Sequence, residues 1–313
     1  MPIKPEYLKL FIRATEEAAY GAFKFIGKGD KIAADQAAVD NMRRELNKID
    51  MDGKIVIGEG EMDEAPMLFI GERVGTKKGQ KLDIAVDPLE GTNFVANNKP
   101  NSFSVLAAAQ ENNLFFAPDT YMEKIVVGKN LPNNLLDLDN TVEKNISLLS
   151  SAKKINPNKL TVCILERPRH EKIISSLKKM NVQLKLISDG DVSGAIQVVD
   201  NNSPVDMYMG IGGGPEGVLA AAALSCHGGQ MQTRLVMDSK ETERAKKMGI
   251  QDVNKKYNIE EMIKGDVMFC ATGITSGDLT EGIKDSNDFY EATTLALHKS
   301  ENINSIFKNK IKK

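Results

Sequence analysis

Two carboxylates and a hydroxyl follow one predicted strand closely. Residues 82–86 are apolar and predict a buried strand, and the segment Asp-Pro-Leu-Glu-Gly-Thr then brings Asp87, Glu90 and Thr92 into a single loop. The proline cannot donate to a sheet ladder and the glycine permits a tight turn, so the chain should leave the sheet sharply. Carboxylates at this spacing can converge on hard divalent cations, which neutralise phosphate esters and supply hydroxide. The same residues also make an ordinary strand end and turn, in which Thr92 caps the next element.

A second acidic loop lies upstream of the first. Residues 54–57 predict another short strand, which runs into Gly-Glu-Gly-Glu-Met-Asp-Glu-Ala-Pro-Met-Leu at positions 58–68. The carboxylates of this loop, Glu59 and Asp63 among them, repel one another unless they are solvated or share cations. A solvated acidic loop that begins a helix is the alternative. Two such loops after successive strands favour a metal site.

Asp35 is a third candidate ligand. It follows the glycine-containing segment 27–34 and precedes a helical pattern that begins at Gln36. By itself, this position predicts an N-cap, whose side chain accepts a hydrogen bond from the first helical turn.

A glycine-rich turn follows the predicted strand 205–209. It reads Gly-Ile-Gly-Gly-Gly-Pro-Glu-Gly at positions 210–217, and the apolar run 218–224 predicts a helix after it. A strand, a glycine-rich turn and a helix N-terminus favour an anion site, because main-chain N–H groups and the helix dipole point at the ligand. The order of glycines matches neither common nucleotide-binding fingerprint. Glu216 suits the first helical turn and is equally able to bind a cation.

Together these segments resemble the class II fructose-1,6-bisphosphatases, within the lithium-sensitive sugar and inositol phosphatase superfamily. The Asp-Pro-x-Glu-Gly-Thr element alone indicates the superfamily. The class is indicated by the acidic loop 58–68, by the glycine-rich turn, and by Tyr-Met-Glu-Lys at 121–124, Arg-Pro-Arg-His at 167–170 and Asp-Gly-Asp at 189–191. The resemblance covers the chain from the first helix to about Leu279.

The resemblance implies a role for each matching position. The metal-binding carboxylates would be Asp35, Glu59, Asp87, Glu90 and Glu216. Glu90, Gly91 and Thr92 would hold the phosphate that is cleaved, Thr92 would help activate the attacking water, Asp63 would orient or deprotonate, and Lys31 would lie near the metals. The sugar and its second phosphate would contact Tyr121, Arg167, Pro168, Arg169, Asp189, Gly190, Asp191 and Gly213. Paired arginines suit a fixed phosphate better than lysines do.

Hydrophobic periodicity predicts an α/β protein. From residue 158 strands and helices alternate, which predicts a mostly parallel sheet with ligands at the strand ends. The predicted helices are an amphipathic first segment from Leu8 to Phe25, then 35–49, 141–154, 169–180, 191–199 and 215–226; the predicted strands are 54–57, 82–86, 102–109, 124–127, 160–165, 182–187, 205–210 and 266–271. The resemblance implies a layered α-β-α-β-α sandwich, with α+β character in the N-terminal half.

Asn156-Pro157-Asn158 is the expected domain boundary. It would separate a metal-binding domain, residues 1–157, from a substrate-binding domain, residues 158–313. The lysine-rich tail 300–313 departs from the family's usual final strand, and we expect it to be disordered.

Composition is that of a metabolic enzyme rather than a nucleic-acid or membrane protein. The chain has 313 residues and a net charge of −2, so no basic excess favours nucleic acid or an anionic membrane. The N-terminus lacks the apolar core of a secretory signal, which leads us to expect the cytoplasm. Cys163, Cys226 and Cys270 are widely spaced and are expected to lie reduced in the core, and His170 is expected at a surface helix start.

The function that the resemblance implies is metal-dependent hydrolysis of the 1-phosphate of fructose 1,6-bisphosphate, a step of gluconeogenesis. A sedoheptulose bisphosphatase, an inositol-phosphate phosphatase and a non-catalytic sugar-phosphate sensor remain alternatives. Oxygen ligands admit both Mn²⁺ and Mg²⁺, and the family favours manganese. A homodimer or homotetramer is expected by resemblance.

Overall fold

The computed structural model describes residues 2–60, 67–247 and 249–313, and the chain divides into two compact units. The first unit contains Met1–Phe116 and Ile263–Lys313, and the second contains Ala117–Met262. This division differs from the expected boundary at 157/158, because the last strands of the chain return to pair in the first sheet. Asn156-Pro157-Asn158 lies inside the second unit, between a helix and the strand that follows it.

The first unit is built on a mixed sheet with the strand order β12-β13-β11-β4-β3-β1-β2, and β14 pairs with β13. Among these strands only β1 and β3 run parallel. The bounds are β1 (Met51–Ile57), β2 (Arg73–Val74), β3 (Gln80–Glu90), β4 (Phe103–Gln110), β11 (Val267–Gly273), β12 (Lys284–Asp285), β13 (Phe289–His298) and β14 (Ile303–Lys312).

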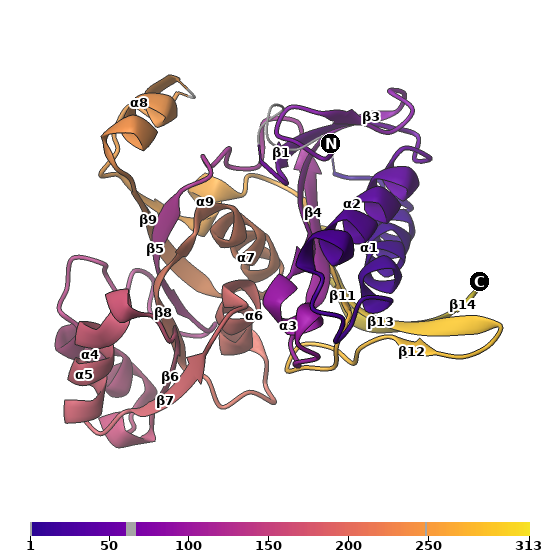
Figure 1. The fold of residues 1–313 in the computed structure, drawn as a ribbon. Helices are drawn as coiled ribbons and strands as arrows, with labels where there is room; N and C mark the ends of the chain where they lie inside the picture. The colour runs from indigo at the N-terminus through magenta and orange to yellow at the C-terminus, as the bar shows by residue number, and fades with distance from the viewer. Residues whose placement is uncertain (1, 61–66, 248) are drawn as a thin grey trace. The chain divides into compact units, whose positions relative to one another are not determined.

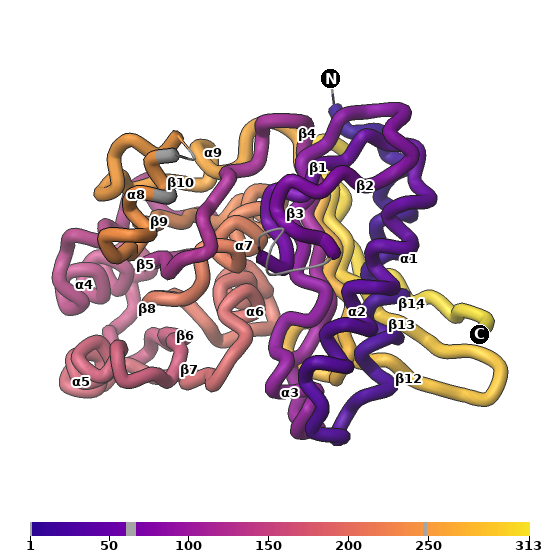
Figure 2. Tube along the Cα trace, turned by 45° about the horizontal axis from the view of Figure 1, so that its top comes forward, coloured from indigo at the N-terminus to yellow at the C-terminus, as the bar shows by residue number. Residues whose placement is uncertain are grey.

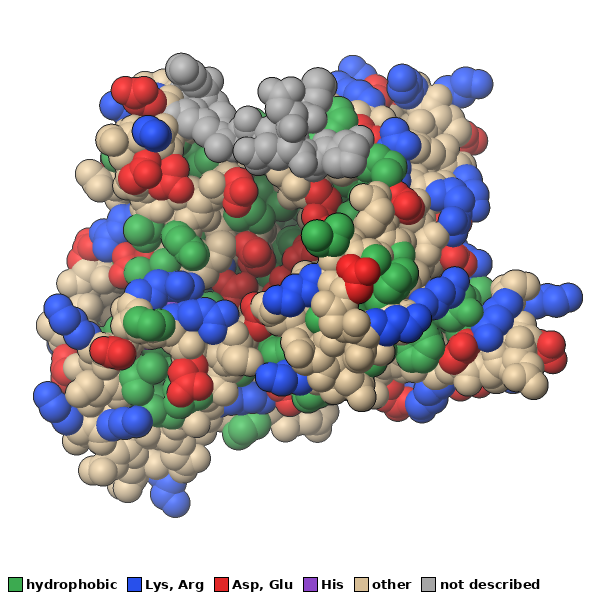
Figure 3. Space-filling model, viewed as in Figure 1, with side chains coloured by type: hydrophobic (Ala, Val, Ile, Leu, Met, Phe, Trp, Pro, Cys, Tyr) green, Lys and Arg blue, Asp and Glu red, His purple; other side chains and the backbone are tan. Residues whose placement is uncertain are grey.

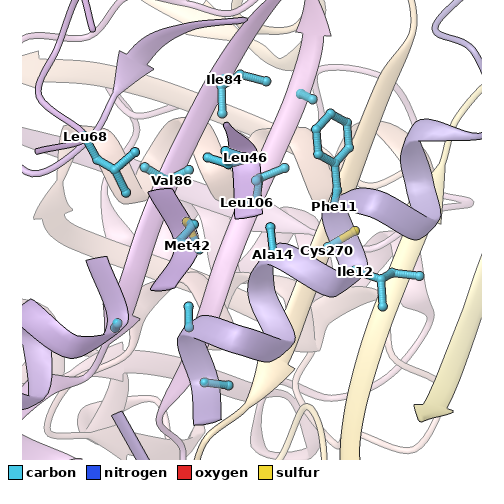
Figure 4. Packing of buried hydrophobic residues seen from close by; sticks show 14 of the residues in the cluster. Phe11, Ile12, Ala14, Met42, Leu46, Leu68, Ile84, Val86, Leu106 and Cys270 are labelled. Carbon is cyan, nitrogen blue, oxygen red and sulfur yellow. The ribbon is translucent and has the colours of Figure 1, made fainter. Parts of the chain in front are cut away.

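Two helices cover one face of this sheet. α1 (Tyr7–Phe23) confirms the predicted amphipathic helix, α2 (Lys31–Leu46) the second, and a short α3 (Thr92–Ala96) follows β3. Apolar side chains of α1 and α2 pack on alternate residues of β3, β4 and β11, as period-two alternation along a strand requires (Figure 4). Cys270 lies in this core as predicted.

The C-terminal tail is ordered, so the expectation of disorder was wrong. β14 pairs with β13 over ten residues in antiparallel register, from Phe289↔Lys312 to His298↔Ile303. Figures 1 and 2 show these yellow strands beside the indigo N-terminal helices, and the side chain of Asn309 reaches Glu16 of α1. In the second half of this segment Lys308, Lys310 and Lys312 alternate with Phe307, Asn309 and Ile311, which is the signal of a strand with one exposed face.

The second unit is an α-β-α layer structure. Its sheet has the order β10-β9-β5-β8-β6-β7, with parallel pairing of β6 to β7 and to β8. The strands are β5 (Tyr121–Val127), β6 (Thr161–Leu165), β7 (Gln183–Ile187), β8 (Met207–Gly213), β9 (Gln230–Val236) and β10 (Lys256–Asn258). The helices are α4 (Val142–Lys153), η1 (Pro157–Lys159), η2 (Pro168–His170), α5 (Glu171–Lys179), α6 (Asp191–Ile196), η3 (Gln197–Val199), α7 (Gly214–His227), α8 (Ser239–Lys247) and α9 (Ile259–Met262).

Helices lie on both faces of this second sheet. α4 and α5 pack on one face through Ile146, Leu149 and Leu177. α6 and α7 pack on the other face, where Gly194 and Gly217 allow close approach to side chains of the sheet. The predicted α/β class is therefore confirmed. The parallel order predicted for the strands after residue 158 holds for β6, β7 and β8, but β5, β9 and β10 join the same sheet antiparallel to their neighbours, so the sheet as a whole is mixed.

The distribution of charge on the surface agrees with the small net charge of the chain. Acidic and basic side chains are interspersed on the face drawn in Figure 3. Across the described ranges, no helix combines the length and the apolar character needed to cross a membrane. None of the three cysteines, all within those ranges, forms a disulfide.

Candidate active site

The end of β3 shapes the first acidic loop. Asp87 folds its Oδ1 back onto the N–H of Leu89 at 3.0 Å, and the pairing of β3 with β4 is irregular between Asp87 and Glu90. Gly91 then takes φ +77°, a left-handed conformation that glycine tolerates. A Cβ at that position would lie 2.7 Å from the ring of Phe94. The chain therefore leaves the sheet only after Glu90, later than the expected end of the strand at residue 86, and the turn forms at Gly91.

Thr92 is the first residue of α3 rather than its cap. Gly91 occupies the N-cap position, and the Thr92 hydroxyl donates to the carbonyl of Leu89 at 3.3 Å. The main chain of Glu90 is held as well, because the Ser102 hydroxyl of the next segment donates to its carbonyl at 2.8 Å. Glu90, Gly91 and Thr92 thus form one braced turn, with Glu90 buried and Thr92 half-buried.

Asp35 lies within α2, so its expected N-cap role was wrong. Asp30 is the N-cap, and its side chain accepts a hydrogen bond from the N–H of Ala33 at 3.0 Å. Asp35 is one turn further on, half-buried, and burial together with the charge of Asp87 raises the pKa of Asp35 to about 6. Lys31, the first residue of the helix, is exposed.

Glu59 follows β1, and its main chain is anchored. Its N–H donates to the carbonyl of Leu68 at 3.1 Å, and the N–H of Ile70 donates to the carbonyl of Gly60 at 2.9 Å. The carboxylate of Glu72 supports this turn. It accepts hydrogen bonds from the N–H of Leu68 and, at 2.5 Å, from Nε of Arg43 on α2. Asp63 lies outside the described residues.

A divalent cation fits the carboxylates of this first unit. Asp87 and Glu90 each present an oxygen within 4.8 Å of the other, and Asp87 also acts electrostatically on Asp35. Like charges this close disfavour ionisation unless a cation is shared. The donors are all oxygens, which Mg²⁺ and Mn²⁺ accept.

In the second unit, one end of the sheet gathers Tyr121, Arg169 and the glycine-rich turn. Arg169 donates from Nε and Nη2 to the carbonyl of Ile211 at 3.0 and 2.8 Å, and its guanidinium lies over the Tyr121 ring, 4.8 Å from the centroid. Arg167 does not join this group: it bonds the carbonyl of Glu166 and, with Pro168, lines a separate cavity of about 730 Å³ beside α5.

His170 is buried, so the expected surface position was wrong. Its Nδ1 lies 2.7 Å from the carbonyl of Leu165, and its Nε2 accepts from the N–H of Ile211 at 2.8 Å. Because Nε2 accepts, Nδ1 carries the proton, and burial lowers the pKa of His170. Its neutral ring ties η2 to β8, which positions Arg169.

The glycine-rich turn makes room for carboxylates. A Cβ on Gly212 would lie 1.9 Å from Oδ2 of Asp191, and a Cβ on Gly213 would lie 1.7 Å from Oε2 of Glu216. Glu216 sits in the first turn of α7 and lies against Gly213, the N-cap residue. The anion site expected from this turn is therefore occupied in part by the protein's own acidic side chains.

Asp189, Gly190 and Asp191 connect β7 to α6. Asp189 accepts from the N–H of Gly190 at 3.2 Å, and Gly190 has φ +81° at the N-cap of α6. Asp191 is buried, and its Oδ2 accepts from Nζ of Lys124 at 2.5 Å.

The supporting roles of Glu72 and Lys124 and the burial of His170 were not predicted from the sequence. Lys124 carried a usable signal, because it lies between Met122 and Val126 on the same buried face of β5. A charged residue at an apolar strand position indicates a buried partner. Glu72 carried no such signal, since its partners are distant in sequence.

The chain is similar to proteins of one known family. Residues 6–310 match the family model described as bacterial fructose-1,6-bisphosphatase, glpX-encoded. The chain is 42% identical over 311 residues to a fructose-1,6-bisphosphatase class 2 of Haemophilus influenzae, covering 95% of this chain and 93% of that protein. It is also 42% identical to fructose-1,6-bisphosphatase 1 class 2 of Escherichia coli, covering 95% and 92%.

A third relative carries a double name. The D-fructose 1,6-bisphosphatase class 2/sedoheptulose 1,7-bisphosphatase of Synechocystis is 42% identical over 87% of this chain and 86% of its own length. With a family model spanning nearly all of its residues and relatives of this similarity, the chain belongs to the bacterial class 2 fructose-1,6-bisphosphatase family.

Proposed function

We propose that the protein hydrolyses the 1-phosphate of fructose 1,6-bisphosphate to give fructose 6-phosphate and phosphate, using divalent metal ions. The observation that carries this proposal is the acidic group of Asp35, Asp87 and Glu90 around the braced turn that ends in Thr92. A dianionic phosphate would be repelled by these carboxylates alone, so binding of a phosphate ester beside them calls for cations. Family membership supports the same activity.

The metal would be held by Asp35, Glu59, Asp87 and Glu90 of the first unit, and the resemblance adds Glu216 of the second. When bound, the ions neutralise the phosphate and lower the pKa of a water molecule. We propose Mn²⁺ as the preferred ion, with Mg²⁺ as the other that this oxygen set accepts.

Other residues of the chain would bind the phosphate and orient the attacking water. The turn Glu90–Thr92 would hold the phosphate that is cleaved, and the Thr92 hydroxyl would orient the attacking water; the resemblance assigns Asp63 the role of proton acceptor. Lys31 would contribute positive charge near the metals. Such groups act by position and by charge, which is how phosphoryl transfer is catalysed in general.

The second unit would recognise the sugar and its second phosphate. Arg169 supports this role, since its guanidinium is already fixed by the Ile211 carbonyl and the Tyr121 ring. The resemblance assigns Arg167 and Pro168 to the same ligand, whereas the structure places them at a separate cavity beside α5. The loop Asp189–Asp191 would accept hydrogen bonds from sugar hydroxyls, and Gly213 would allow close approach of the ligand.

A sedoheptulose bisphosphate is the second candidate substrate. It carries the same two phosphate groups on a longer sugar, and the Synechocystis relative is named for both activities. A cytoplasmic location stays a prediction from the N-terminal sequence, and a homodimer or homotetramer stays a prediction made by resemblance.

The test is phosphate release by metal-stripped protein. Fructose 1,6-bisphosphate, sedoheptulose 1,7-bisphosphate and inositol monophosphate would each be supplied with Mn²⁺, with Mg²⁺ and without metal. We expect metal-dependent release from the fructose ester. Faster release from another ester would identify that ester as the preferred substrate. No release from any of the three esters would refute the proposal and favour a non-catalytic sensor.

Asp87→Asn and Asp83→Asn make a matched pair for this assay. Both residues lie on β3, but Asp83 accepts from main-chain N–H groups, and those of Asn113 and Leu114 lie 2.9 and 3.2 Å from its Oδ2. An asparagine at position 83 can keep those bonds. We expect Asp87→Asn to lose metal-dependent release and Asp83→Asn to retain it.

A further inference from the structure

A lysine is buried in the middle of the second sheet. Lys124 of β5 is 1% exposed, and its side chain lies on the face of the sheet that α6 and α7 cover. An ammonium group removed from water is strongly unfavourable unless it is paired and hydrogen-bonded. Its partner is Asp191, which is itself 6% exposed and accepts from Nζ at 2.5 Å.

Glycines lie beside the Lys124–Asp191 pair. A Cβ on Gly212 would lie 1.9 Å from Oδ2 of Asp191 and 3.1 Å from Nζ of Lys124. A Cβ on Gly217 would lie 3.1 Å from Cε of Lys124. Two glycines, Gly212 of β8 and Gly217 of α7, therefore leave the space that the pair fills.

The two carboxylate oxygens of Asp191 have different roles. Oδ2 is committed to Lys124, which leaves Oδ1 for another donor. A carboxylate held through one oxygen has a fixed orientation, so its second oxygen accepts a hydrogen bond from a defined direction. Sugar hydroxyls are recognised by acceptors that are placed in this way.

We propose that Lys124 is a positioning residue for substrate recognition: it fixes the carboxylate of Asp191 so that Oδ1 accepts from a sugar hydroxyl of the substrate. This inference rests on the proposed function, because it takes Asp191 as a sugar contact. Lys124 itself acts through Asp191 and touches no reacting atom.

A buried ion pair with only a structural role would give different kinetics. Removing one partner of a buried pair destabilises a protein strongly, and that loss alone would appear in the unfolding temperature. If Lys124 positions Asp191, its replacement also weakens substrate affinity. That effect on affinity disappears when residue 191 no longer has a carboxylate. A double-mutant cycle measures this dependence directly.

The experiment compares Lys124→Met, Asp191→Asn and the double variant with the wild type in the metal-loaded enzyme. We expect each single change to raise KM for fructose 1,6-bisphosphate by about tenfold or more, as loss of a charged hydrogen bond predicts, with kcat much less affected. The double variant should raise KM no further than Asp191→Asn alone. Lys185→Met is the matched control: Lys185 of β7 donates to Gln197 at 2.6 Å, away from Asp191, and its loss should leave KM unchanged.

Several outcomes overturn the inference. An active Lys124→Met enzyme with unchanged KM would do so, as would additive effects of the two changes on KM. If Lys124→Met does not fold, as judged by circular dichroism, Lys124→Gln replaces it in the cycle: the shorter, neutral amide removes the charged hydrogen bond to Asp191, so KM should still rise. A wild-type protein that releases no phosphate refutes the proposed function itself, which the variants alone cannot do.

Discussion

Replacing Glu16 by glutamine should stabilise the protein at alkaline pH and have little effect at acidic pH. Glu16 lies on α1, 2% exposed, and its Oε1 accepts from Nδ2 of Asn309 on β14 at 2.7 Å. Burial raises the pKa of Glu16 from 4.5 to about 7, even though the Asn309 bond and the charge of Arg13 act to lower it. Glutamine keeps an oxygen for Asn309 and removes the charge.

The magnitude and the pH window follow from linkage. Between the unfolded pKa of 4.5 and the folded pKa of about 7, the folded state binds more protons than the unfolded state, so stability falls as pH rises. Below 4.5 both states are protonated and no penalty exists; above 7 the penalty is complete. The difference between the two pKa values corresponds to about 3 kcal/mol, an upper value for the gain from Glu16→Gln at pH 8.

Urea unfolding at pH 5, 6, 7 and 8 measures this gain. The difference in unfolding free energy between Glu16→Gln and wild type should grow across that series, and most of the growth should come before pH 7. Glu6→Gln, at an exposed position before the same helix, serves as the control and should show no such trend. A gain that is constant with pH, or that is larger at pH 5 than at pH 8, would refute the reasoning.

Three further predictions concern the candidate site. Thr92→Ala should lower kcat by about a hundredfold or more, within the range for loss of a positioned catalytic group, while substrate binding measured by calorimetry changes little. Glu72→Ala should weaken Mn²⁺ binding about tenfold in calorimetry of the substrate-free protein, because loss of a supporting hydrogen-bond partner costs about 10–100-fold in metal affinity and Glu72 braces the turn that carries Glu59. Gly212→Ala should raise KM and lower the unfolding temperature together, because its Cβ would lie 1.9 Å from Oδ2 of Asp191.

Each of these has a result that contradicts it. Wild-type turnover in Thr92→Ala would remove the hydroxyl from the mechanism. Unchanged metal affinity in a destabilised Glu72→Ala protein would limit Glu72 to a structural role. A Gly212→Ala protein with wild-type KM would show that the Asp191 carboxylate tolerates displacement.

Local pattern predicted most of the elements that carry the candidate site. The strands predicted at 82–86, 54–57 and 205–210 appear as β3, β1 and β8, although β3 and β8 continue into residues that were predicted as loop and turn. Apolar runs that end in Gly, Pro and Asp are short-range signals, so they are readable without knowledge of the fold. The capping role expected for Asp35 failed for the same reason, because Asp30, five residues earlier, competes for the same local role and wins it.

Sheet direction and the return of the C-terminus were decided by tertiary structure. Ten residues of β14 pair with β13, and β11 pairs with β4 from more than 150 positions earlier in the chain. No local pattern encodes these pairings, since they depend on which strand edges remain open after the earlier strands have paired.

The sequence by itself determined which acidic residues follow which strands, and hence the chemistry available at those strand ends. Only the tertiary structure decided what holds those residues in place. Glu72 braces the Glu59 turn, His170 ties Arg169 to β8, and Lys124 fixes Asp191. The physical reason is that a ligand-type carboxylate is recognised by its local context, whereas its support comes from buried partners that are distant in sequence and are brought together only by packing.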